Sequence, residues 1–155
     1  MARREMSHES IKRDIEEKLG QVRARIEAAC ARAGRNPSSV TLIGVVKTFG
    51  PEVVRAAYDA GLRHFGESYA QDLRDKTEVL SDLPDVHWHF IGRLQTNKVR
   101  YLAGKVELVH ALDRMEAALA LSKRLERMDL APLDVLISVN LGGESSKSGV
   151  AEHEL

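Results

Sequence analysis

The chain alternates short apolar runs with segments of helical periodicity, and this alternation constrains the fold more than any other feature of the sequence. The first run, 40–47, is rich in β-branched residues, as a buried strand is, and Pro51 and Gly61 bound the helical segment that follows it. Strands that alternate with helices form parallel βαβ units. We expect strands over 40–47, 63–66, 86–91, 106–112 and 133–140, and helices over 51–60, 69–80, 95–103 and 114–128.

A longer helix is expected before the first strand. Apolar residues recur at spacings of three and four over 9–33, and Gly34 then provides a stop. Units of roughly 20–25 residues fit either a (β/α)8 TIM barrel or an open sheet, but a complete barrel usually needs ~200 residues or more. With 155 residues, the chain is expected to form one α/β domain over 1–155 with about five βα units. It is either an open sheet or a partial barrel.

Composition excludes several classes of function. Lys plus Arg number 23 and Asp plus Glu number 23, so the zero net charge argues against nucleic acid or an anionic membrane as the dominant partner. The single cysteine, Cys30, excludes an internal disulfide and suits a reducing compartment, and its place in a helical stripe indicates packing. No apolar stretch approaches the ~20 residues of a membrane helix. We therefore expect a soluble, cytoplasmic protein.

Lys47 ends the first apolar run and is followed by a loop that contains Gly50 and Pro51. In parallel α/β folds, ligands bind at this carboxyl edge of the strands. An amine held there and partly shielded from water can form a Schiff base with an aldehyde. The alternative interpretation is a lysine that only ends the strand and extends to solvent.

Further polar residues follow the other expected strands, and a parallel barrel would open all these loops on one face. The glycine- and serine-rich segment 142–149 suits an anion site but also has the composition of an ordinary turn. The polar residues at strand ends are Glu67, Ser68, Arg93, Gln95, Asp113 and Asn140.

His87 and His89 share one face of the third expected strand at a spacing that suits metal binding. No acidic or cysteine partner stands at a matching position, so we expect no metal. Trp88 faces the other side and is expected to pack in the core. Asp113 and Glu67 also have structural interpretations, as a helix cap and as a carboxylate at a helix start.

Four segments together resemble the YggS/PROSC family, the pyridoxal 5′-phosphate homeostasis proteins. Residues 45–48 are similar to its Val-Ser-Lys-Thr, and 64–71 to its Phe-Gly-Glu-Asn-Tyr-x-Gln. Residues 87–98 resemble His-Trp-His-Phe-Ile-Gly-x-Leu-Gln-x-Asn-Lys, and 139–149 resemble Val-Asn-x-x-x-Glu-x-x-Lys-x-Gly. The resemblance covers nearly the whole chain in order.

The resemblance implies a pyridoxal 5′-phosphate (PLP) barrel like the N-terminal domain of alanine racemase, without that enzyme's second domain. Lys47 would form the internal aldimine, and Ser68, His89 and Asn140 would be further cofactor-binding residues. Ser68 replaces the family's usual Asn, and Val46 its usual Ser, which alters the expected contacts. The family would continue for roughly three more strands, which are expected to supply the phosphate cup.

Three functions follow as alternatives. The leading one is PLP homeostasis, in which the chain stores the cofactor reversibly and delivers it to PLP-dependent apoenzymes. Lys147 would offer a second amine, or would be a solvated surface lysine. The second is an amino-acid racemase or decarboxylase, although no residue matches the second acid or base that racemisation needs. The third is a truncated fragment that binds nothing, whose open barrel edges favour self-association.

Overall fold

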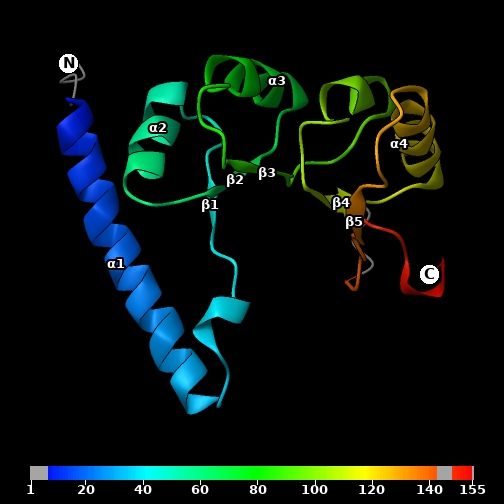
Figure 1. Ribbon diagram of the computed structural model, residues 1–155. Coiled ribbons are helices and arrows are strands. Elements are labelled where there is room, and N and C mark those ends of the chain that lie inside the picture. The colour runs from blue at the N-terminus through cyan, green and yellow to red at the C-terminus, as the bar shows by residue number, and fades with distance from the viewer. Residues whose placement is uncertain (1–6, 143–147, 155) are drawn as a thin grey trace.

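The computed structural model describes residues 7–142 and 148–154 and contains the predicted parallel sheet (Figure 1). Its five strands pair in the order β1-β2-β3-β4-β5, all parallel. This consecutive order is that of a barrel wall, because each strand lies beside the next strand in the sequence. The strands are β1 (Ile43–Val45), β2 (His64–Glu67), β3 (His87–Phe90), β4 (Leu108–Leu112) and β5 (Asp134–Ile137).

Helices cover one face of this sheet, while α1 runs alongside α2 at the β1 edge (Figure 1). Ser7 caps α1 by accepting a hydrogen bond from the Ser10 amide at 3.3 Å, and Pro51 begins α2. The helices are α1 (His8–Arg32), α2 (Pro51–Asp59), α3 (Ala70–Val79) and α4 (Met115–Arg127), with 3₁₀ turns over Pro37–Ser39, Thr96–Tyr101 and Glu152–Glu154.

The two faces of the sheet differ in chemistry. Phe65, Trp88 and Val109 are buried in the core beneath the helices, and the rings of Phe65 and Trp88 lie 5.8 Å apart. Because side chains alternate along a strand, their neighbours His64 and His89 belong to the opposite face. The predicted packing roles of Trp88 and of buried Cys30 are confirmed.

Several predicted boundaries were too long. The first strand covers 43–45 rather than 40–47, because Lys47 and Thr48 already form a turn. The segment predicted as a helix over 95–103 is a 3₁₀ turn over Thr96–Tyr101. Asp113 is not a helix cap, since Arg114 occupies that position and the Asp113 carboxylate binds arginines instead.

Within the described residues, no helix combines the length and the apolar character needed to cross a bilayer.

Candidate functional site

A pocket of about 450 Å³ lies at the carboxyl ends of β1, β2 and β3, where the sequence predicted a site. Its volume is within the range of small-molecule sites. Loops that follow three successive strands supply most of its wall, so the parallel sheet brings together residues that are distant in the sequence. The lining residues are Lys47, Ser68, Tyr69, Ala70, Gln71, Phe90, Gly92, Arg93, Gln95 and Lys98.

Lys47 stands on a tight turn after β1. The amide of the buried residue Val46 donates to the Gly66 carbonyl at 2.9 Å, and the Phe49 amide donates to the Val46 carbonyl at 3.1 Å. Thr48 has a φ of 69°, which is unusual for a β-branched residue and costs roughly 1–3 kcal/mol. The Lys47 side chain is exposed rather than half shielded, so the expected desolvation is not present.

A buried ion pair lies beneath this turn. Lys76 of α3 pairs with the Glu67 carboxylate at the end of β2 and donates to the Val46 carbonyl at 2.9 Å. The other Glu67 oxygen, Oε1, accepts from the amides of Ser68 at 2.7 Å and Tyr69 at 3.1 Å. The pair therefore fixes the residue before Lys47 relative to the backbone of Ser68.

Sequence reasoning missed Lys76, although a signal was present. Lys76 lies three residues after Leu73 and four before Leu80, on the buried stripe of α3, with a relative exposure of only 5%. A lysine within an apolar helical stripe needs a buried partner, and Glu67 is that partner.

Gly92 allows the loops after β2 and β3 to touch. A Cβ atom at this position would lie 2.1 Å from the Ser68 carbonyl oxygen. Since no side chain fits in that space, a glycine is required where the two loops form the pocket wall.

Arg93 joins the loop after β3 to the loop after β4, where Arg114 binds the same Asp113 carboxylate. Arg93 donates to the Asp113 carboxylate at 2.7 Å, and Arg114 donates to it at 3.0 Å. Burial raises the pKa of Asp113, but the hydrogen bond and charge of Arg114, with those of Arg93, outweigh it and hold the pKa below its ordinary value. Together with Lys47 and Lys98, Arg93 makes the pocket wall cationic, which suits an anionic ligand.

The other two predicted cofactor residues lie outside this lining. His89 bonds on the opposite sheet face to His64 and His110, each at 3.0 Å. Burial, followed by the neighbouring histidines, lowers the pKa of His89 to about 4, so its ring is neutral at pH 7. The Asn140 amide donates to the Val150 carbonyl at 2.8 Å, after β5.

Lys47 and Ser68 are thus brought together by the fold, and His89 and Asn140 do not join them in this pocket. The predicted second amine, Lys147, and the center of the glycine- and serine-rich loop lie at 143–147, outside the described residues.

Comparison with known proteins identifies close relatives, although no protein-family model matches the chain. A pyridoxal phosphate homeostasis protein from Aquifex aeolicus (strain VF5) is 50% identical over 139 residues, which cover 90% of this chain and 60% of that relative. The protein of the same name from Escherichia coli (strain K12) is 42% identical over 144 residues, covering 92% of this chain and 61% of the relative.

A solved structure agrees with these sequence relatives. PipY of Synechococcus elongatus PCC7942, solved with PLP bound, has a TM-score of 0.74 and 32% identity, and the match covers 88% of this chain and 57% of PipY. The predicted resemblance and the partial-barrel fold are confirmed. The chain spans about 60% of the length of the curated relatives it matches.

Proposed function

We propose that this chain, a homologue of the pyridoxal phosphate homeostasis proteins over about 60% of their length, binds PLP in the pocket at Lys47. The observation that supports this most is the placement of an exposed lysine amine in one pocket with Arg93 and Lys98. When bound, PLP supplies an aldehyde, with which a primary amine condenses reversibly with loss of water. Its phosphate is an anion, for which a cationic wall is suited.

Each residue has a distinct part in this proposal. Lys47 provides the amine, and the turn at Thr48 with the buried Lys76 holds its backbone in place. Arg93 adds a positive charge that attracts the phosphate, in addition to the phosphate cup that the resemblance assigns to the family's later strands, and Asp113 holds the Arg93 side chain in place. Ser68 offers a hydroxyl at the pocket wall. His89 and Asn140 stay predictions as cofactor contacts.

The proposed role is PLP homeostasis rather than catalysis. Reversible condensation at Lys47 stores a reactive aldehyde, and PLP-dependent apoenzymes are the proposed acceptors. Residues 1–155 then form a single PLP-binding domain of the alanine-racemase barrel type, with part of the barrel wall. The single cysteine suits the proposed cytoplasmic location.

An amino-acid racemase or decarboxylase is the second candidate, because Tyr69 lines the same pocket as Lys47 and is exposed. Racemisation needs a group that donates or accepts a proton on each face of the substrate, and a tyrosine and a lysine are groups of this kind. Incubation of the chain with PLP and L-alanine, followed by chiral chromatography, distinguishes the two functions. Formation of D-alanine that Tyr69→Phe abolishes supports the enzyme, and retention of the L-form supports the homeostasis role.

Parallel absorbance titrations with PLP and with pyridoxal, which lacks the phosphate, test the binding proposal. Lys47→Ala should abolish the absorbance change, whereas Lys105→Ala should not, because Lys105 pairs with Glu78 at 3.5 Å and does not line the pocket. Arg93→Gln should weaken PLP about tenfold or more but leave pyridoxal unchanged, as expected for a charge-assisted contact. If Lys47→Ala and Lys105→Ala showed the same absorbance change with PLP, Lys47 would have no special role, and the chain would be a fragment without a working site.

A further inference from the structure

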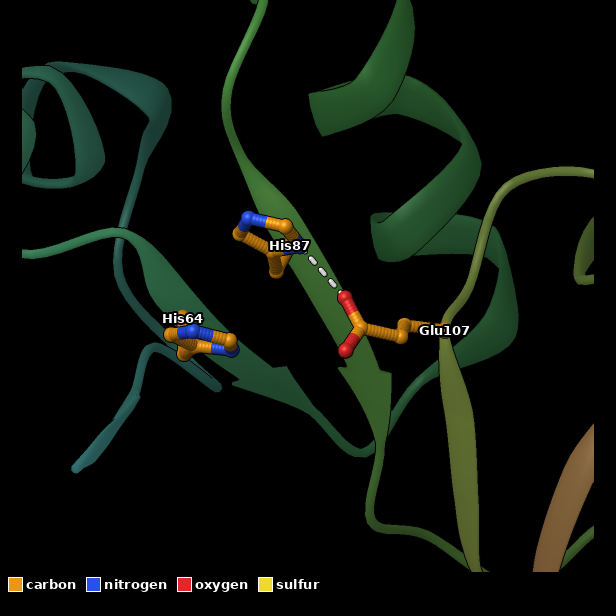
Figure 2. Close-up of side chains that lie close together, drawn as sticks. All are labelled: His64, His87 and Glu107. Carbon is orange, nitrogen blue, oxygen red and sulfur yellow. Dashed lines mark hydrogen bonds and ion pairs between the residues drawn. The ribbon is translucent and has the colours of Figure 1, made fainter. Parts of the chain in front are cut away.

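A second cluster of ligand-type side chains lies at the opposite, amino ends of the strands (Figure 2). It comprises His64 at the start of β2, His87 at the start of β3, and Glu107 just before β4. One nitrogen of each histidine and one carboxylate oxygen all lie within 4.8 Å of one another. This cluster shares no residue with the pocket at Lys47.

The sheet register creates this grouping. His64 and His87 are direct partners in the β2–β3 ladder, and their rings stack with centroids 4.4 Å apart and an interplanar angle of 14°. The Glu107 amide donates to the Trp88 carbonyl at 2.8 Å, which places the Glu107 carboxylate beside His87. Figure 2 shows that carboxylate directed at the His87 ring, to which it is bonded through Nδ1.

The expectation of no metal rested on the lack of an acidic partner for His87 and His89 along the sequence. The partners of His87 instead come from the neighbouring strands. His64 lies 23 residues before His87 in the sequence, and Glu107 lies 20 residues after it. Two imidazoles with one carboxylate are the ligand set of several zinc and non-haem iron sites, in which water or substrate fills the remaining positions.

We propose that His64, His87 and Glu107 bind a divalent first-row transition-metal ion, with Zn²⁺ as the probe. The ion replaces the direct contact between His87 and Glu107, and the negative carboxylate of Glu107 offsets part of the positive charge of the ion. Only the exposed His87 ring turns about χ2, a broad torsion, while His64 keeps its Nδ1 bond to His89 and binds the ion through its other nitrogen, Nε2.

Histidines behind the proposed ligands hold His64 in place. His64 is also bonded through Nδ1 to His89, and His89 to His110, each at 3.0 Å. Contacts of this kind fix the ring orientation of metal-binding histidines. His87 and Glu107 are exposed and His64 is half-buried, so the ion reaches the site from solvent. Binding there connects β2, β3 and the start of β4 at the end of the sheet remote from Lys47.

Calorimetric titration with Zn²⁺ tests the proposal on the full chain, prepared without a histidine tag and stripped with a chelator. We expect one equivalent to bind. His87→Gln and Glu107→Gln should each weaken the affinity about tenfold or more. Both positions are exposed, so the variants should stay folded, which circular dichroism checks.

His153→Gln is the matched control, because His153 is exposed and belongs to no such group among the described residues. It should leave Zn²⁺ binding unchanged, and so should Lys47→Ala, which separates this site from PLP binding. No bound Zn²⁺, or equal affinity in His87→Gln, Glu107→Gln and His153→Gln, would overturn the proposal.

Discussion

At the scale of single residues, a buried ion pair holds the backbone beside the exposed amine of Lys47. Glu67 has no exposed surface and Lys76 is 5% exposed, yet each has its partner. Burying two charges is expensive, and the cost is recovered only when hydrogen bonds satisfy the remaining donors and acceptors. The Val46 carbonyl and the Ser68 and Tyr69 amides provide those bonds.

Lys76→Met should destabilise the fold by about 3–5 kcal/mol, because it leaves the Glu67 carboxylate buried and unpaired. Adding Glu67→Gln should recover part of this loss, since the double variant has no isolated charge. Lys105→Met, which breaks only a surface pair, should cost about 0–1 kcal/mol. Urea unfolding measures the free energy of unfolding of these three variants. If Lys76→Met lost no more stability than Lys105→Met, the proposed role of the buried pair would be contradicted.

The lowered pKa of Asp113 predicts that the free energy of unfolding depends on pH. Because the pKa of Asp113 is lower in the folded chain than in the unfolded one, its pairs with Arg93 and Arg114 stabilise the fold fully above about pH 4. This stabilisation is lost as the pH falls through the lowered pKa. Asp113→Asn should therefore be less stable than the wild type at pH 7, with the difference shrinking below about pH 4. Urea midpoints from pH 7 to pH 2 test this, and parallel pH profiles would disprove it.

At the scale of elements, the sequence pattern predicted the strands and most of the helices, apart from the 3₁₀ turn over Thr96–Tyr101, but not which residues pair across the sheet. The apolar run 40–47 indicated β1 correctly, although only Ile43–Val45 forms the strand. Register is a property of two strands together, so no single segment could show that His64 would stand opposite His87. The position of Lys47 was predictable because it depends only on where a strand ends.

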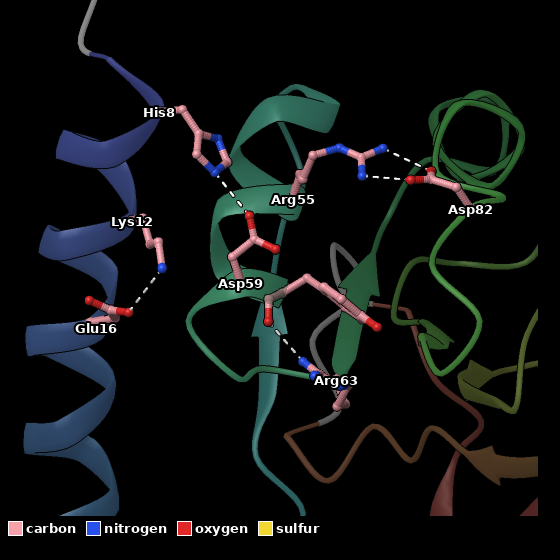
Figure 3. A network of polar contacts seen from close by, with 8 residues as sticks. His8, Lys12, Glu16, Arg55, Asp59, Arg63 and Asp82 are labelled. Carbon is pink, nitrogen blue, oxygen red and sulfur yellow. Dashed lines mark hydrogen bonds and ion pairs between the residues drawn. The ribbon is translucent and has the colours of Figure 1, made fainter.

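Surface ion pairs also join the elements (Figure 3). His8 of α1 bonds to Asp59 of α2 at 3.0 Å, and Arg55 of α2 makes two bonds to Asp82, at 2.7 and 2.8 Å. The hydrogen bond and charge of Arg55 lower the pKa of Asp82. Exposed pairs of this kind contribute little each, so the position of α1 depends mainly on its packing against α2, with Ile15 and Leu19 of α1 against the core.

Gly92→Ala should cost about 1–3 kcal/mol and impair PLP binding, because its Cβ would displace the Ser68 carbonyl and separate the two pocket loops. Gly20→Ala is the control. Gly20 lies within α1 with nothing within 4 Å of an added Cβ, so this variant should gain about 0.5–1 kcal/mol. Thermal unfolding and PLP titration compare the two variants. A Gly92→Ala chain with wild-type stability would refute the close approach of Gly92 to the Ser68 carbonyl.

At the scale of the whole molecule, the sheet has a well-packed centre and an exposed β5. Along β5 the exposed fractions are 37% for Val135, 50% for Leu136 and 55% for Ile137, and Leu141 beyond it reaches 82%. Residues on both faces of this strand are thus accessible. Apolar edge strands pair readily with other chains.

We therefore expect this chain to self-associate through β5 as its concentration rises. Leu136→Lys should reduce the association, because a charge on an edge strand disfavours pairing. Lys123→Glu, on the exposed surface of α4, serves as the control and should leave the association unchanged. Sedimentation velocity measures the effect, and a monomer at all concentrations would rule it out.

We propose that the pocket at the carboxyl ends of the strands makes Lys47 the reactive amine of this chain. Borohydride reduction in the presence of PLP, followed by peptide mass mapping, is the decisive test of this proposal. We predict a single adduct at Lys47 that Lys47→Ala abolishes and Lys105→Ala retains. Adducts scattered over surface lysines, or none, would contradict the claim and indicate that the resemblance reflects ancestry without a working site in this chain.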